Sequence, residues 1–137
     1  MRGADTFPIR VGDAALQTKA FTAEDVAEYR DLSGDAGLRF GPGGAEAVPG
    51  PLLAGMISDL LGTTLPGLGT MWMKQTLVYL GSAALGATVT AAVRVTRLRP
   101  DKGLVDLEAT CRCGGEDVVT GRALVMVPNL ADRTVQE

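Results

Sequence analysis

The sequence predicts an α+β fold in which a curved antiparallel sheet wraps around one apolar helix. Two observations lead to this prediction. The stretch 51–64 repeats large apolar residues at helical spacing, and the residues after Gly69 alternate in the manner of strands joined by tight turns. A chain of 137 residues has the length of one domain, so we expect 1–137 to form a single unit around one core.

The first predicted helix, together with the residues that lead into it, spans Lys19 to Asp35. Thr22 suits the N-cap position, and two acidic residues follow it in the first turn, where the helix dipole favours negative charge. The segment Ser33-Gly34-Asp35 is expected to end this helix. The glycine-rich stretch 37–44 that follows is incompatible with regular structure.

The second predicted helix runs from Pro51 to Thr64. Proline suits a first helical turn, and the segment from Gly62 to Gly67 suits a stop. Asp59 is the one charged residue among its apolar positions. A helix with so little polar surface is expected to be largely buried.

Four strands are predicted over 71–79, 88–98, 104–112 and 118–127, with turns at 99–103 and 113–116, as an antiparallel meander. In the first of these strands, regular alternation predicts one face directed toward the helix and Trp72 on the other face with Lys74. The predicted helix-facing residues are Met71, Met73, Gln75, Leu77 and Tyr79.

The composition argues against several classes of partner. A net charge of −3 gives no electrostatic footprint for nucleic acid or an anionic membrane. No apolar run reaches the roughly 18 residues that a membrane span needs, and the N-terminal sequence is too polar for a signal peptide. We therefore expect a cytoplasmic protein that binds neither nucleic acid nor membrane.

The chain contains no histidine, which removes the commonest general base and any Ser-His or Cys-His nucleophile. Cys111 and Cys113 would point to the same face of a strand, an arrangement that suits neither a disulfide nor a complete metal site. We therefore expect no metal and no cofactor.

Four stretches resemble the MaoC-like (R)-specific enoyl-CoA hydratases, and their order and spacing match as well. They are FTAEDV at 21–26, LSGD at 32–35, LPGLG at 65–69 followed by Gln75, and LRPDKG at 98–103. The resemblance implies a hotdog fold and at least a homodimer whose sheets join edge to edge. It also implies acyl pockets near the subunit interface.

The chain departs from this family at the catalytic motif. The family pattern D-x-N-P-x-H, which activates water for addition to an enoyl thioester, keeps its aspartate as Asp35, whereas Phe40 stands in place of the histidine. A second family histidine is replaced by Pro49, and Ser58 falls where the family has a serine in the central helix. The segment that covers the pocket in the family is shorter here and rich in glycine.

These departures favour a repurposed enzyme that folds a polyketide-like or acyl chain in an apolar pocket and promotes its cyclisation. Intramolecular cycloaddition needs no base, and holding two segments in a reactive arrangement gives large accelerations by itself. The candidate catalytic residues are Asp35, Ser58, Gln75 and Tyr79. The candidate substrate-binding residues are Phe40, Met56, Met71, Trp72 and Met73.

Two other interpretations stay open. The chain could be an enoyl-thioester hydratase or dehydratase that relies on Asp35, or a subunit that binds an acyl chain without catalysis. Asp35 itself could instead be a structural residue that caps the glycine-rich loop after the helix. In each case we expect a hydrophobic small-molecule ligand and a homodimer or higher homo-oligomer.

Overall fold

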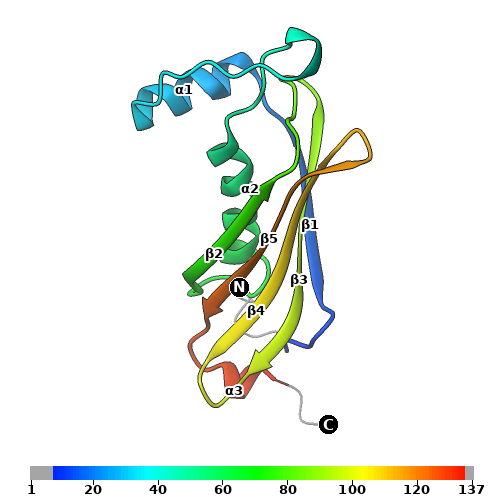
Figure 1. The fold of residues 1–137 in the computed structure, drawn as a ribbon. Helices are drawn as coiled ribbons and strands as arrows, with labels where there is room; N and C mark the ends of the chain where they lie inside the picture. Colours follow the sequence, from blue (N-terminus) through cyan, green and yellow to red (C-terminus); the bar gives the residue numbers. More distant parts are fainter. Residues whose placement is uncertain (1–7, 135–137) are drawn as a thin grey trace.

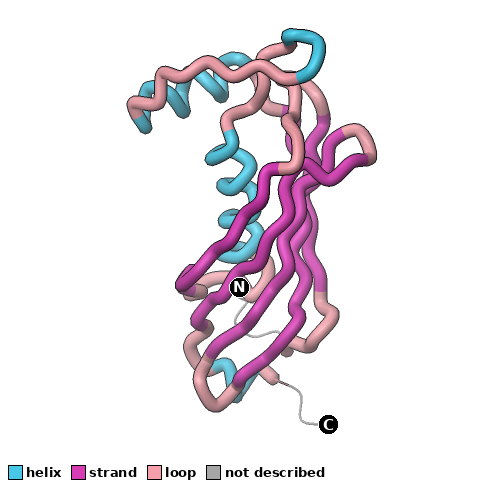
Figure 2. Tube along the Cα trace, in the orientation of Figure 1, coloured by secondary structure: helices cyan, strands magenta, loops and turns pink. Residues whose placement is uncertain are grey.

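The computed structural model describes residues 8–134 and contains a five-stranded antiparallel sheet with one long helix packed against one face (Figure 1). Figure 2 shows the strands as one curved layer beside that helix. The elements in chain order are β1 (Ala14–Ala20), α1 (Ala23–Ser33), the 3-10 turn η2 (Pro42–Gly44), α2 (Gly50–Thr63), β2 (Met71–Tyr79), β3 (Thr88–Arg99), β4 (Leu104–Cys113), β5 (Glu116–Met126) and α3 (Leu130–Arg133). The predicted α+β class is confirmed. The predicted single-domain span also includes residues 1–7 and 135–137, which lie outside the described part of the chain.

The sheet order is β1-β3-β4-β5-β2, which corrects the predicted meander in part. The hairpins β3–β4 and β4–β5 form as expected, whereas β2 pairs with β5 at the far edge. The reason is the connection between β2 and β3, which spans residues 80–87 and is too long for a tight hairpin turn. β2 is therefore an edge strand.

The opposite edge is β1, a strand that the sequence analysis does not predict. It pairs with β3 from Ala14, opposite Arg94, to Ala20, opposite Thr88. Lys19 and Ala20 therefore end a strand and do not lead into a helix, which begins only after Thr22.

The core lies between α2 and the inner face of the sheet. Alternate residues of the three central strands point toward α2, as a half-buried antiparallel sheet requires. The fully buried helix residues include Leu53, Ile57 and Leu61, spaced four apart along one side of α2. No helix in the described residues is both long enough and apolar enough to cross a membrane.

α1 lies at one end of the molecule, beyond the start of α2 (Figure 1). Thr22 caps it as predicted: the Thr22 hydroxyl accepts from the Asp25 amide at 3.1 Å, and the Asp25 carboxylate accepts from the Thr22 amide at 2.9 Å. Gly34 ends the helix with φ of 79°, a left-handed conformation that suits glycine. Both ends of α1 are thus fixed, although only Val26 of this helix is fully buried.

The faces of β2 differ from the predicted alternation because the strand contains a bulge. Trp72 pairs with Val125 and Lys74 with Leu124, so Met73 is an extra residue without a partner. One extra residue reverses the alternation. Trp72 therefore lies on the helix-facing side, opposite the buried Val125, and Met71 on the outer side, which corrects the prediction for both residues.

Candidate functional site

A pocket of about 470 Å³ lies at the α1 end of the molecule, between the start of α2 and the end of β2. Apolar side chains dominate its lining, and one arginine and two hydroxyl-bearing residues interrupt them. The lining residues are Arg39, Phe40, Ala47, Val48, Gly50, Pro51, Leu53, Tyr79, Gly81 and Ser82. Its size and lining suit a small apolar ligand.

The loop before α2 forms one wall of this pocket and is held by backbone hydrogen bonds. The Ala47 amide donates to the Arg39 carbonyl at 2.8 Å, and the Val48 amide donates to the Ala83 carbonyl at 2.7 Å. Gly41 lies so close to Ser82 that a Cβ there would be 2.5 Å from the Ser82 hydroxyl oxygen. The loop is thereby fixed against the segment that follows β2.

Asp35 lies directly after the C-cap of α1, and both its carboxylate oxygens accept hydrogen bonds. Oδ2 accepts from the Tyr29 hydroxyl at 2.8 Å and from the Arg39 guanidinium at 3.0 Å. Oδ1 accepts from the Gly37 amide at 3.1 Å. An ionised carboxylate offers about four acceptor positions. These three bonds leave one, on Oδ1, for a further donor such as water.

These hydrogen bonds keep Asp35 ionised. The Tyr29 hydroxyl, the Gly37 amide and the Arg39 guanidinium, in decreasing order of effect, lower the pKa of the Asp35 carboxyl below its ordinary value. At neutral pH, Asp35 is therefore a carboxylate that can accept a proton but holds none to donate.

Arg39 connects Asp35 to the pocket. Its guanidinium bonds the carboxylate, while the residue itself lines the pocket beside Phe40. Phe40 is 63% exposed, a large value for an aromatic side chain, and its ring contributes to the open apolar wall. The site thus has a phenyl ring at the position where the motif resemblance predicts a histidine.

Tyr79 closes the other side of the pocket. Its hydroxyl donates to the Gly50 carbonyl in the first turn of α2 at 3.0 Å. Burial raises the pKa of the Tyr79 phenol above its ordinary value, and the neighbouring Cys111 and Tyr29 raise it further. Tyr79 therefore stays a neutral donor at physiological pH.

The structure brings together only part of the predicted site. Phe40 and Tyr79 line the pocket, and Asp35 reaches it through Arg39. Ser58 is half-buried on α2, eight residues beyond Gly50 and therefore roughly 12 Å further along the helix axis.

The remaining predicted residues lie elsewhere in the chain. Met56 belongs to the core, and Met71 and Met73 are exposed on the edge strand β2. Gln75 faces the helix side, where its side chain accepts from the Trp72 indole at 2.9 Å and donates to the Thr76 carbonyl at 2.8 Å. The amide is thus satisfied within β2 and does not reach the pocket.

Three residues at this site were not predicted from the sequence: Tyr29, Arg39 and Ser82. Arg39 immediately precedes Phe40, the residue that draws attention in the motif, so its position was readable from the sequence. Tyr29 precedes Asp35 by six residues, and only the turn at Gly34 brings the two side chains together. No sequence pattern marks Ser82 as a site residue, because it lies in the connection after β2.

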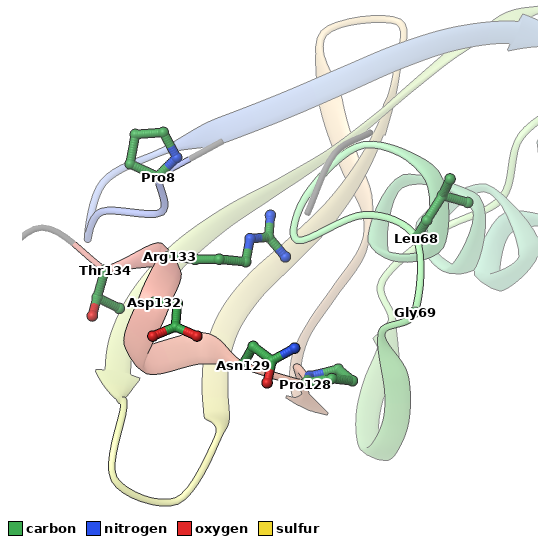
Figure 3. A pocket seen from close by; sticks show the side chains of 8 residues that line it. All are labelled: Pro8, Leu68, Gly69, Pro128, Asn129, Asp132, Arg133 and Thr134. Atoms are coloured by element: carbon green, nitrogen blue, oxygen red, sulfur yellow. The ribbon is translucent and has the colours of Figure 1, made fainter. Parts of the chain in front are cut away.

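A second hollow, of about 480 Å³, lies at the opposite end of the molecule near α3 (Figure 3). It is lined by Pro8, Leu68, Gly69, Pro128, Asn129, Asp132, Arg133 and Thr134. None of the predicted catalytic or binding residues lies there. The buried Arg133 donates to the Pro66 carbonyl at 2.8 Å and so ties α3 to the loop after α2.

The two cysteines are free thiols on β4. Burial raises the pKa of the Cys111 thiol to about 11, so this group is not a nucleophile at neutral pH. Among the residues the structure describes, no three metal-ligating side chains form a cluster.

The chain is similar to proteins of known activity. It is 38% identical over 129 residues to an (R)-specific enoyl-CoA hydratase of Aeromonas caviae, a match that covers 88% of this chain and 96% of the relative. It is 47% identical over 79 residues to an (R)-specific enoyl-CoA hydratase of Rhodospirillum rubrum, where the match covers 58% of this chain and only 55% of the relative.

A solved structure agrees with these sequence relatives. The (R)-hydratase from A. caviae involved in PHA biosynthesis superposes with a TM-score of 0.81 at 34% identity, over 88% of this chain and 98% of that one. No family model matches the chain. The sequence and the fold thus point to the same set of relatives.

Proposed function

Since the chain belongs to the family of (R)-specific enoyl-CoA hydratases and has their hotdog fold, we propose that it hydrates an enoyl thioester, or dehydrates the 3-hydroxyacyl product, with Asp35 as its proton-transfer group. The observation that carries this proposal is the state of Asp35. Its carboxylate is ionised, oriented by three donors, and has one acceptor position left.

The acyl chain is proposed to occupy the 470 Å³ pocket, against Phe40, Val48 and Leu53. Apolar contact with these side chains removes the chain from water, which is favourable by about 25 cal/mol per Å² of buried apolar surface. A pocket of this volume suits a short or folded acyl chain.

The thioester carbonyl is proposed to lie near the first turn of α2, where Gly50 and Pro51 line the pocket. This helix end carries a partial positive charge. Pro51 has no N–H and the Leu52 amide donates to the Pro49 carbonyl at 3.0 Å, so the Gly50 amide is the donor proposed for the carbonyl oxygen. A carbonyl oxygen placed there is polarised, which stabilises the negative charge that develops during water addition.

Asp35 is proposed to take a proton from the reacting water and to return it to the substrate. Oδ1 accepts a proton from the bound water as the water oxygen forms its bond to the β-carbon. The electron pair of the carbon–carbon double bond moves to the α-carbon. The protonated Asp35 then returns that proton to the α-carbon, so the carboxylate is regenerated and one water has been added. Dehydration follows the same steps in reverse.

A carboxylate with a lowered pKa is a weak base, and the site has no histidine to share the task. Loss of one member of a general acid–base pair costs roughly 10²–10⁴-fold in rate. The proposed hydratase is therefore slow, and its rate is set by how well Asp35 is held.

The test is hydration of crotonyl-CoA, followed by the loss of absorbance of the enoyl thioester. We expect measurable turnover in the native protein, none in Asp35→Asn, and an increase of tenfold or more in Phe40→His, which restores a second proton-transfer group. The exposed position of Phe40 accommodates this substitution without repacking the core. Turnover that persists in Asp35→Asn contradicts the proposal.

A second candidate is cyclisation of a folded polyketide-like chain, and one observation favours it. Phe40 turns the position of the missing histidine into apolar wall, and such a wall can hold a flexible chain in a reactive shape without proton transfer. In that case, Phe40→Ala and Tyr79→Ala lower turnover more than Asp35→Asn does. Binding of crotonyl-CoA without turnover of any substrate indicates the third possibility, a subunit that only binds acyl chains.

The proposed assembly is a homodimer that joins through β2. This strand is a sheet edge, and Met71, Trp72 and Met73 on it are between 39% and 57% exposed, an apolar edge of the kind that pairs with another strand. Light scattering of the purified protein tests this, and Met73→Lys is expected to shift the population toward monomer. The cytoplasmic location stays a prediction.

A further inference from the structure

We infer that Tyr29 is a positioning residue for Asp35: its hydroxyl fixes the direction of the carboxylate and leaves one lone pair of Oδ1 open for the reacting water. This inference rests on the proposed function. It concerns a residue that touches neither the pocket nor the substrate and acts only through Asp35.

The hydroxyl of Tyr29 comes from a rigid part of the molecule. Tyr29 lies three residues after the buried Val26, on the same side of α1, and the capping box and Gly34 fix the two ends of that helix. The helix turn also contributes Ser33, whose hydroxyl donates to the Tyr29 carbonyl at 2.7 Å and accepts from the Asp35 amide at 3.1 Å. The backbone on both sides of the Tyr29–Asp35 contact is thereby held.

Arg39 bonds the same oxygen but cannot fix it equally well. The Arg39 side chain is 41% exposed and belongs to the glycine-rich loop, so salt screens its charge and a ligand in the pocket can compete for it. The Tyr29 hydroxyl is neutral and half-buried. Because the phenol carries no charge, salt weakens its bond to Asp35 less than it weakens the Arg39–Asp35 ion pair.

The groups that face Asp35 set how its charge depends on pH. They are the Tyr29 hydroxyl from α1, the Gly37 amide, the Arg39 guanidinium and, at its amide, the Ser33 hydroxyl. Arg30 lies nearby but is paired with Glu46 at 3.1 Å. The hydrogen bond to Asp35 raises the pKa of the Tyr29 phenol above its ordinary value, so Tyr29 stays a hydroxyl donor at neutral pH.

The experiment compares Tyr29→Phe with the native protein by carbon-13 NMR titration of the Asp35 carboxyl and by the pH dependence of crotonyl-CoA hydration. Phenylalanine keeps the ring and removes only the hydroxyl. We expect the titration midpoint of Asp35 to move to higher pH, and the acid limb of the rate profile to move with it. On the plateau, kcat is expected to fall on the order of tenfold at unchanged KM, because the base is no longer aligned.

Thr22→Ala is the matched control. It weakens the start of α1 through the loss of the cap and makes no contact with Asp35. We expect it to lower stability without moving the Asp35 titration midpoint or the acid limb. A Tyr29→Phe variant whose midpoint and acid limb equal those of the native protein overturns the inference.

The two readouts separate this inference from the proposed function. The carboxyl titration is measured on the resting protein and needs no turnover. Absence of hydration in the native protein overturns the proposed function, whereas an unmoved titration midpoint in Tyr29→Phe overturns the role of Tyr29.

Discussion

The phenol of Tyr79 lies directly against the backbone of Gly50: its hydroxyl donates to the Gly50 carbonyl at 3.0 Å, and a Cβ on Gly50 would lie 2.8 Å from its ring carbon Cε1. This contact joins the end of β2 to the start of α2, and both residues line the pocket. Glycine is needed at position 50 because a Cβ there would collide with the Tyr79 ring. The two residues together shape the pocket.

Gly50→Ala is expected to displace the Tyr79 ring and to lower the free energy of unfolding by about 1–3 kcal/mol. In a Tyr79→Ala background, the same substitution should become neutral or stabilising, because alanine is favoured over glycine in a helix by up to about 1 kcal/mol. Urea unfolding of the four proteins measures the coupling. Equal effects of Gly50→Ala in both backgrounds contradict the contact.

Gly121→Ala is expected to be strongly destabilising. A Cβ at Gly121 would overlap the backbone carbonyl of Thr76 on the paired strand β2, and backbone cannot move aside without breaking the β2–β5 ladder. We expect the free energy of unfolding measured in urea to fall by about 3 kcal/mol, the upper end of the usual cost of overpacking. Gly55→Ala is the control: its Cβ would meet no atom within 4 Å, so it should stabilise α2 by about 0.5–1 kcal/mol. Similar losses in both variants contradict this reasoning.

The acid stability of the chain is expected to depend on Asp25 and Asp35. The backbone hydrogen bond at Thr22 chiefly lowers the pKa of the Asp25 carboxyl below its ordinary value, and the Tyr29 hydroxyl chiefly lowers that of Asp35. Because both folded-state values lie below the unfolded ones, this stabilisation is present above pH of about 4 and is lost as the pH falls through the folded values.

Thermal unfolding of the native protein and of the Asp25→Asn/Asp35→Asn variant, from neutral pH downward, measures this effect. The variant should be less stable at neutral pH, and the difference should shrink as both carboxylates of the native protein take up protons. A stability difference that stays constant down to pH of about 2 argues against the two carboxylates as its source.

Thiol labelling should distinguish the two cysteines. Cys111 is fully buried with a pKa raised to about 11, whereas Cys113 is only half-buried at the end of β4. We expect iodoacetamide at pH of about 8 to modify Cys113 in the folded protein and Cys111 only after unfolding. Peptide mass spectrometry identifies the labelled residue, and the variant Cys113→Ser should take up no label while folded.

The apolar helix and the three central strands were predictable because their burial imposes a regular pattern. α2 shows helical spacing and β3 to β5 alternate because one face of each is packed in the core. β1 escaped prediction because it is an edge strand whose sequence, AALQTKA, shows no clear alternation. The bulge at Met73 escaped prediction because apolar residues occupy both faces of β2 there, so no pattern marks the extra residue.

Residues of the site were predictable from the sequence only where they belong to a recognisable motif. Asp35 and Phe40 stand out from the sequence because they fall at the two ends of a recognisable motif. Arg39 and Tyr29 act through contacts with Asp35 that depend on the turn at Gly34, and such contacts are set by the fold. Met71 and Met73 of β2 were predicted at the pocket only because they are apolar. Apolar residues also occur on an exposed sheet edge, which is where the structure has them.

The strand order also determines the sequence of events during synthesis. Ala14 of β1 pairs with Arg94 of β3, so β1 must wait for some eighty further residues to be synthesised before its ladder with β3 can form. α2 is synthesised before β2, β3 and β4, three of the strands that pack against it. Pairings so distant along the chain fold slowly and leave apolar surface uncovered meanwhile. We therefore expect the nascent chain to bind chaperones that cover the apolar side of α2 until the sheet packs against it.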